Sequence, residues 1–246
     1  MSDDPSADPN NASLSDQKKK KRKRSICERC ERPTPAACIC EALPSEPLEL
    51  KHCHCLVLQH PHESRRKNRS LPLIELCLSQ QSISVSVARR FGDAIDSTIM
   101  DRLNKSRNPI WLIYPDSENG ISLQQALQER KSEANETNET ESKPVTIVFL
   151  DGTWKYAKEM DQANREEKQY PSHMKRIQLM ESDLKELTRS KRFDIRTPPS
   201  DQHLSTAECI SWVVSKVEGN EDIYQTLMKP LDFMVERWHS FKTQKR

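Results

Sequence analysis

Apolar residues in this chain occur in short runs that alternate with segments of helix-forming composition. The clearest run covers residues 145–150, where five apolar residues and one threonine follow one another without alternation. Such a continuous pattern is typical of a strand that is buried on both faces. Residues 155–160 then have helix-forming composition. Residues 151–154, Asp-Gly-Thr-Trp, are therefore predicted to form a tight turn between a core strand and a helix.

The rest of the chain repeats this alternation. One predicted helix begins at a capping box formed by Ser205 and Glu208 and ends at Gly219. The helix after it, the last in the chain, is expected to kink at Pro230. Buried strands alternating with helices indicate an α/β sheet covered on both faces. We predict further strands at 56–58, 83–87, 109–115 and 176–180, helices at 67–80, 121–130, 205–218 and 222–241, a loop at 59–63, and an extended segment at 192–199.

Composition bounds the part of the chain that can form a packed core. Hydrophobic residues make up 34% of the 246 residues and charged residues 31%, which predicts sizeable segments outside the core. Residues 1–17 are polar without periodicity and are expected to be disordered, and the low-complexity segment 131–144 is expected to be a disordered loop insertion. No apolar run approaches the ~20 residues of a membrane span, and the polar start lacks a secretory signal. We therefore expect a soluble protein without a membrane partner.

Lys18–Arg24 is an unbroken run of basic residues within the polar tail 1–25. Runs of this kind serve as nuclear-import signals or as nucleic-acid clamps, and a solvated tail without a partner is the remaining interpretation. The net charge of +2 does not separate these alternatives, because it averages very unequal segments. We expect the protein in the nucleus and the cytoplasm.

Two closely spaced cysteine pairs follow the basic run, at Cys27 and Cys30 and at Cys38 and Cys40. In a reducing compartment such pairs indicate metal ligands rather than disulfides. Four thiolates fill the coordination shell of zinc, so the predicted ion is structural, and free thiols in a loose segment are the alternative. The tract 52–55, His-Cys-His-Cys, leads into a strand and lacks two further ligands on one face, so we do not predict a second metal site there.

Asp151 is the candidate for chemistry in the turn after residues 145–150. Ligands of open α/β sheets bind at the carboxyl ends of strands, and Gly152 would let a ligand approach the backbone closely. The competing interpretation is that Asp151 or Thr153 only caps the helix that follows.

Eight short motifs follow one another along the chain. They are Cys27–Pro33, Cys38–Cys40, Gln59–Glu63, Arg89–Phe91, Leu112–Pro115, Leu150–Trp154, Ile195–Arg196 and Leu204–Cys209. With this ordered set the chain resembles the DTW-domain proteins, the tRNA-uridine aminocarboxypropyltransferases, and most of all their second eukaryotic subtype. The resemblance implies a SPOUT-like knotted α/β domain at residues 49–246, preceded by a zinc-binding module at residues 26–48.

The resemblance also implies a reaction. S-adenosylmethionine (SAM) would donate its 3-amino-3-carboxypropyl group to N3 of a uridine in tRNA, forming acp3U and methylthioadenosine. Asp151 would be the general base that removes the N3 proton, or would instead hold the donor by its charge, and His60 is the second candidate for the base. Trp154 would stack on a base or on adenine, or would be a core anchor. Arg196 would pair with the donor carboxylate or an RNA phosphate, or would form a structural ion pair.

Three loops and one further residue are expected to hold the donor, by analogy with SPOUT-like enzymes. Free N–H groups at the start of the helix that follows Ser205 would receive a carboxylate or a phosphate. The cofactor-binding residues implied in this way are Tyr114, Pro115, Leu150, Gly152, Thr153, Trp154, Arg196, Leu204, Ser205 and Thr206.

Two other functions remain open on the sequence. One is a SAM-dependent RNA methyltransferase, and the other is a non-catalytic, zinc-containing RNA-binding adaptor. Asp151 at a strand end argues against the adaptor, which has no need of such a carboxylate. The tRNA species, the position of the uridine and the oligomeric state do not follow from the residues.

Overall fold

A six-stranded sheet forms the centre of the fold in this computed structural model, which describes residues 25–66, 69–94, 108–115, 120–136, 143–188 and 204–243. The strand order is β2-β1-β5-β3-β6-β4, and every neighbouring pair is parallel. The predicted α/β class is confirmed. The strands are β1 (Cys53–Gln59), β2 (Ile83–Val87), β3 (Ile110–Ile113), β4 (Ile121–Ser122), β5 (Val145–Asp151) and β6 (Lys175–Gln178).

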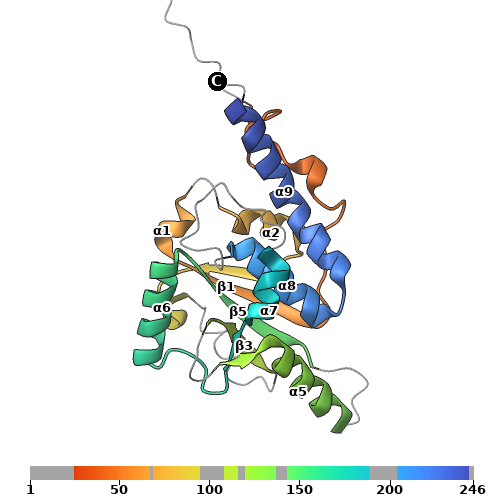
Figure 1. Cartoon of the computed structure of the whole chain (residues 1–246). Coiled ribbons are helices and arrows are strands. Elements are labelled where there is room, and N and C mark those ends of the chain that lie inside the picture. Colours follow the sequence, from red (N-terminus) through yellow and green to blue (C-terminus); the bar gives the residue numbers. More distant parts are fainter. Residues whose placement is uncertain are drawn as a thin grey trace, which may run out of the picture.

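Helices cover both faces of this sheet (Figure 1). Side chains of α2 (Leu71–Cys77), α5 (Leu123–Glu136), α7 (Glu181–Thr188), α8 (Thr206–Glu218) and α9 (Glu221–Thr243) share one core with one face of the strands. Side chains of α3 (Phe91–Ala94) and α6 (Trp154–Glu166) form a second core on the other face. Two short helices, η1 (Cys40–Ala42) and α1 (Pro61–Ser64), complete the set in the described part of the chain.

The continuous apolar runs of the central strands follow from this double cover. In β1, Val57 faces the core shared with α8, whereas Leu56 and Leu58 face the core shared with α6. In β5, Ile147 faces the core shared with α8, whereas Val148 faces the core shared with α6. A strand with helices on both faces needs apolar residues at successive positions, and the sequence pattern of residues 145–150 has this form.

The two helices after the strands confirm several predictions. Ser205 and Glu208 form the reciprocal capping box at the start of α8, and Gly219 ends the helix with φ 65°. α9 contains Pro230 in its interior and continues to Thr243. Figure 1 shows α9 extending beyond the sheet, with the cysteine-containing N-terminal segment beside it.

Arg130 holds the amino ends of two central strands together. Its buried guanidinium donates to the carbonyl oxygen of His52, which precedes β1, at 3.1 Å, and to that of Lys143, which precedes β5, at 2.9 Å. Arg130 therefore connects the backbone before β1 to the backbone before β5.

Several predicted boundaries are wrong. The predicted loop at 59–63 contains the end of β1 and α1, and the helix predicted at 67–80 covers only α2. The helix predicted from residue 121 begins at Leu123, because Ile121 pairs with Ile177 in the sheet, and it continues to Glu136 into the segment predicted as a loop. α7 was not predicted. The expectations for residues 1–24, 137–142 and 192–199 lie outside the described residues.

Among the described helices, none combines the length and the apolar character that crossing a bilayer requires.

Candidate active site

Three neighbouring strands end level with one another at the carboxyl edge. The parallel register pairs Gln59, the last residue of β1, with Asp151, the last residue of β5, and with Val87, the last residue of β2. Because all strands run in one direction, the loops that follow them leave from the same edge. This edge carries the site.

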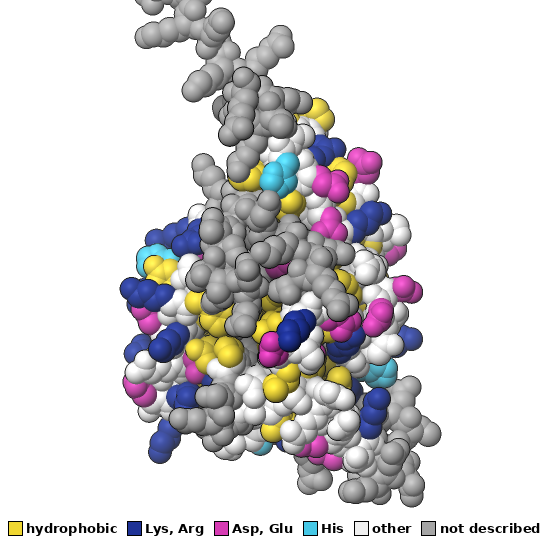
Figure 2. All heavy atoms as spheres, viewed as in Figure 1, with side chains coloured by type: hydrophobic (Ala, Val, Ile, Leu, Met, Phe, Trp, Pro, Cys, Tyr) yellow, Lys and Arg dark blue, Asp and Glu magenta, His cyan; other side chains and the backbone are white. Residues whose placement is uncertain are grey.

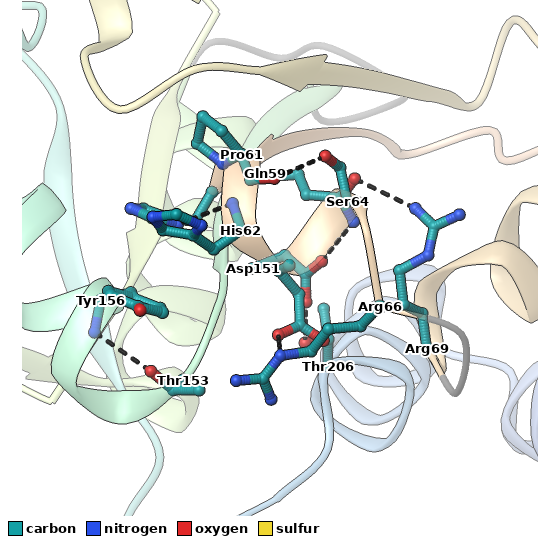
Figure 3. A network of polar contacts seen from close by, with 12 residues as sticks. Gln59, Pro61, His62, Ser64, Arg66, Arg69, Asp151, Thr153, Tyr156 and Thr206 are labelled. Atoms are coloured by element: carbon teal, nitrogen blue, oxygen red, sulfur yellow. Dashed lines mark hydrogen bonds and ion pairs between the residues drawn. The ribbon is translucent and has the colours of Figure 1, made fainter.

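The Asp151 carboxylate connects three separate elements there (Figure 3). Its Oδ2 accepts a hydrogen bond from Gln59 Nε2 at 2.6 Å, and its Oδ1 accepts one from Thr206 Oγ1 at 2.5 Å. Its carbonyl oxygen accepts from the His60 amide at 2.8 Å. The residue is only 4% exposed. One buried side chain therefore joins the ends of β1 and β5 to the first residue of α8.

Hydrogen-bond donors and a helix N-terminus surround the Asp151 carboxylate. Both oxygens accept hydrogen bonds, and the N-terminus of α8 contributes the positive end of its dipole. Arg69 Nη1 donates to Gln59 Oε1 at 3.3 Å, which fixes the amide so that Gln59 Nε2 faces Asp151. Asp151 is thus held in one orientation by its neighbours.

A pocket of about 160 Å³ lies beside this network, on the side of β3 and β6. Its wall combines the strand ends with the first turns of α6 and α8, and it is mostly apolar. The lining residues are Ile113, Tyr114, Pro115, Phe149, Leu150, Gly152, Trp154, Ala157, Leu179, Leu184, Leu204, Ser205, Thr206 and Cys209.

The structure brings eight of the ten implied cofactor-binding residues together around this pocket, namely Tyr114, Pro115, Leu150, Gly152, Trp154, Leu204, Ser205 and Thr206. Thr153 does not line it: its hydroxyl accepts from the Tyr156 amide at 3.4 Å as the N-cap of α6. Arg196 lies outside the described residues. Binding of the donor by these residues stays a prediction, as does the catalytic role of Asp151.

The expected free amides at the start of α8 are not all available. The Glu208 amide donates to Ser205 Oγ at 3.3 Å, and the Ala207 amide donates to Ser70 Oγ at 3.3 Å. The capping box and α2 therefore satisfy donors that the sequence analysis assigned to a ligand.

His60 has a structural role that the sequence did not indicate. Its Nδ1 accepts from the His62 amide at 3.1 Å, so the ring is the N-cap of α1. The ring also stacks on Tyr156 with centroids 4.1 Å apart. Burial first, and then the positive charge of Arg89, lowers the pKa of His60 below its usual 6.5. Because the Nδ1 lone pair already accepts a bond, His60 is poorly arranged to serve as a base.

Trp154 lies at the rim of the pocket rather than in the core. The side chain is 40% exposed and lines the pocket. The interpretation of Trp154 as a core anchor is therefore wrong. An exposed indole beside an apolar pocket offers a face on which a planar ring can stack.

Sequence reasoning missed several residues of the site. The sequence analysis assigns Gln59 to a loop, whereas it is the last residue of β1. A polar residue directly after an apolar run, as Gln59 is after residues 56–58, is a signal for a site at a strand end. Leu179 and Leu184 reach the pocket from the chain after β6, through α7, which was not predicted. Cys209 lines the pocket one turn into α8. Leu179 and Leu184 belong to no polar motif, whereas Gln59 and Cys209 lie at the ends of the motifs Gln59–Glu63 and Leu204–Cys209.

Four cysteines form a separate cluster near α9. The Sγ atoms of Cys27, Cys30, Cys38 and Cys40 all lie within 4.8 Å of one another. Cys27 and Cys40 are 3.4 Å apart and Cys30 and Cys38 are 3.8 Å apart, measured between sulfurs. A tetrahedral zinc ion with Zn–S distances of about 2.3 Å places its thiolates about 3.8 Å apart. The four side chains therefore fit the predicted ion.

The loop between the first two cysteines favours a thiolate. Hydrogen bonds from backbone groups at Cys30, and then from Cys40 and Arg29, lower the pKa of Cys27 to about 6. Arg32 Nη1 contacts Met234 Sδ of α9 at 3.1 Å, and Arg237 Nη1 of α9 donates to the Pro35 carbonyl oxygen at 2.6 Å. The cluster is thus docked on α9, away from the pocket.

The His-Cys tract has ordinary roles in β1. His54 bonds the Gln81 carbonyl oxygen at 2.8 Å and Ser84 Oγ at 3.1 Å. Cys53 and Cys55 are buried in the core that contains α8.

Comparison with known proteins assigns the chain to a family. tRNA-uridine aminocarboxypropyltransferase 2 of Macaca fascicularis is 32% identical over 210 residues, which are 85% of this chain and 62% of that protein. The protein of the same name from Drosophila melanogaster is 27% identical over 85% of this chain and 73% of its own length. The chain thus spans less than two thirds of the Macaca relative. No solved structure matches. The DTW domain family profile matches residues 24–239, so the chain belongs to the DTW domain family.

Proposed function

We propose that this protein transfers the 3-amino-3-carboxypropyl group of SAM to N3 of a uridine in tRNA, forming acp3U and methylthioadenosine. One observation carries the proposal: residues of three separate motifs in this DTW-domain chain converge on one pocket beside the buried Asp151. The names of the relatives from Macaca and Drosophila support the same reaction.

The reaction forms one bond and breaks one bond. The lone pair of N3 attacks Cγ of the methionine moiety, the Cγ–S bond breaks, and its electron pair neutralises the sulfonium. The N3 proton leaves to a base or to water. Because a sulfonium activates all three of its carbons, the position of the uracil decides which carbon reacts. The protein therefore contributes orientation above all.

The pocket suits such a donor. Apolar side chains from β3, β5 and α7 provide a surface for the adenine, and Trp154 at the rim provides a face for a second ring. Buried negative charge on Asp151, next to the pocket residues Gly152 and Thr206, favours a cationic sulfonium over a neutral thioether. The same charge would help methylthioadenosine leave once the sulfonium is neutralised.

We assign Asp151 an orienting role in place of the general base that the resemblance implied. Both of its oxygens already accept hydrogen bonds from the protein, and the side chain does not line the pocket. It holds Thr206, which lines the pocket, against the strand ends. The base role remains the alternative, and the two differ in their pH dependence, as developed below.

The reaction is tested with two labelled donors. SAM labelled in its carboxyl carbon should transfer label to tRNA and yield methylthioadenosine, whereas SAM labelled in its methyl group should leave the tRNA unlabelled. Methyl label in the RNA together with S-adenosylhomocysteine would establish a methyltransferase instead. Absence of SAM binding by calorimetry would establish the non-catalytic adaptor.

The four-cysteine cluster is proposed to bind one structural zinc ion through Cys27, Cys30, Cys38 and Cys40. The fit of the sulfur positions to tetrahedral geometry supports this ligand set. Elemental analysis should find one zinc per chain, and Cys27→Ser should lower the metal content and the melting temperature. Unchanged metal content in a variant that lacks all four cysteines would exclude this site.

Two finer assignments belong to the same proposal. The first is a SPOUT-like knot in the α/β domain, which the resemblance of the motifs implies. The second is that Lys18–Arg24, which lies outside the described residues, directs nuclear import, so that its removal should leave a tagged protein in the cytoplasm. An unchanged distribution would refute the import signal.

A further inference from the structure

Basic side chains gather on the half of the carboxyl edge that lies across Asp151 from the pocket. They come from the loops after β1 and β2 and from the first turns of α6, and all are exposed. We call this surface the basic edge. Figure 2 shows basic side chains, with histidine among them, at the left of the molecule over the places of α1 and α6 in Figure 1. The basic edge consists of Arg65, Arg66, Arg89, Arg90, Lys155 and Lys158.

A buried asparagine fixes the backbone of the loop after β2. Asn164 of α6 is fully buried, and its Oδ1 accepts from the Phe91 amide at 2.6 Å. Its Nδ2 donates to the Arg89 carbonyl oxygen at 3.2 Å and to the Met160 carbonyl oxygen at 2.6 Å. The residues on either side of Arg90 are therefore held by one amide. Because Asn164 fixes this backbone, Arg89 and Arg90 project from a rigid support.

The loop after β1 is fixed to the same helix by aromatic stacking. The rings of His60 and Tyr156 are parallel within 1°, and His62 stacks on both. The Ala88 amide donates to the Gln59 carbonyl oxygen at 3.1 Å, so the loop after β2 lies directly beside the loop after β1. α6 thus supports both loops of the basic edge from behind.

Half of these cations are not neutralised by the protein. Arg66 lies 3.4 Å from Glu63, Arg90 lies 2.6 Å from Glu167, and Lys155 lies 3.9 Å from Glu159. Within the described residues, Arg65, Arg89 and Lys158 have no ion-pair partner. Single unpaired cations are common on protein surfaces, so the gathering of three on one edge carries the argument. Unpaired positive charge on a rigid support is suited to a polyanion.

We propose that the basic edge binds the phosphate backbone of the tRNA and so positions the target uridine at the pocket. The proposal rests on the proposed function, because it takes RNA as the substrate. Lys155 directly follows Trp154, which lines the pocket, so a strand bound along the basic edge passes the mouth of the pocket. The two halves adjoin at Gly152, which lines the pocket, because a Cβ added there would lie 3.4 Å from Cβ of His60, the first residue after β1.

The test removes only the three unpaired cations, because Arg66 and Arg90 pair with carboxylates. Arg65→Gln, Arg89→Gln and Lys158→Gln are made singly and together in the full chain. The matched control combines three exposed lysines from other surfaces, Lys51→Gln, Lys131→Gln and Lys229→Gln. Binding of unfractionated tRNA is measured over a series of salt concentrations, beside SAM affinity and the melting temperature.

Each lost phosphate contact should reduce the log–log salt slope by about one, so the triple variant should lose about two to three. SAM affinity and the melting temperature should stay unchanged, and the control should keep the wild-type slope. Equal slopes in the triple variant and the control would overturn the proposal. So would a triple variant that binds tRNA normally but loses affinity for vesicles that contain phosphatidylserine.

A crosslinking experiment covers the case of a poorly folded variant. Wild-type protein is photo-crosslinked to tRNA that contains 4-thiouridine, and crosslinks should map to residues 60–66, 88–91 or 154–158. Crosslinks confined to other surfaces would overturn the basic edge even where the enzyme transfers its group. Crosslinks at the basic edge without transfer would refute the proposed function and leave the RNA surface standing.

Discussion

The two halves of the carboxyl edge meet at Asp151 but differ in polarity and in charge. On the side of β3 and β6 the strand ends are covered by α7 and α8 and enclose an apolar pocket. On the side of β1 and β2 the loops that follow the strands carry exposed cations. The proposed donor, a cation with an apolar part, and the proposed polyanionic acceptor need opposite surroundings. A parallel sheet can provide both on one edge, because the loops after all of its strands leave from that edge.

The largest effect is expected where the halves meet. Asp151→Asn should release α8 from the strand ends and lower turnover by about 10²-fold or more, since small displacements of reacting groups cost rates of this size. Thr206→Val, which keeps the carboxylate but removes its α8 partner, should lower turnover nearly as much. Rates are measured as a function of pH beside SAM affinity.

The pH profile separates the two roles of Asp151. For an orienting carboxylate, the Asn variant keeps the shape of the wild-type profile at a lower level. A general base instead predicts that Asp151→Asn loses the acidic limb while Thr206→Val retains most activity. That second pattern would restore the assignment that the sequence resemblance implied.

Asn164→Ala should damage the basic edge and spare the pocket. It leaves the Phe91 amide and the Arg89 carbonyl oxygen without their buried partner, which should lower the free energy of unfolding by about 2–3 kcal/mol. tRNA affinity should fall while SAM affinity is retained. Gln162→Ala, on the exposed face of the same helix, is the control. An equal fall in tRNA affinity and SAM affinity would show that the basic edge and the pocket are not independent.

Gly152→Ala should affect both halves to a smaller extent. An added Cβ would lie 3.3 Å from Tyr156 Cβ and 3.4 Å from His60 Cβ, so it would press on the ring stack, and it would also enter the pocket wall. We expect a loss of about 1–2 kcal/mol in unfolding free energy and weaker SAM binding. In the control, Gly92→Ala, the added group meets only the end of the Gln169 side chain. Full SAM affinity in Gly152→Ala would place the donor elsewhere.

The smallest effect concerns the pH dependence of stability. Because burial lowers the pKa of His60, the unfolded chain takes up a proton before the folded protein does as the pH falls below about 6.5. His60 therefore makes the protein less stable with decreasing pH, from about 6.5 down to its lowered folded pKa. His60→Asn keeps a capping side chain and should remove this contribution. Urea unfolding of both proteins between about pH 5 and 7.5 measures the difference. Parallel curves would mean that His60 titrates normally.

The pocket half was more predictable than the basic half, and the reason is physical. The run 145–150, the glycine turn and the capping box at Ser205 are local patterns, so they identified β5, α6 and α8 correctly. Asn164 carried no such signal, because an asparagine in a helix looks like a surface residue until its neighbours are known. Ile121 resembled the start of a helix, but pairing with Ile177 determines its conformation. Tertiary contacts of this kind have no counterpart in sequence spacing.

The Arg130 contacts at the amino edge have a practical consequence for engineering. Arg130 anchors the carbonyl oxygens of His52 and Lys143 at the ends of β1 and β5 that lie opposite Asp151. A fluorescent reporter on a cysteine substituted for the exposed Lys143 would be separated from Asp151 by the full length of β5. The protein thus offers an internal attachment point for single-molecule work on its proposed RNA substrate.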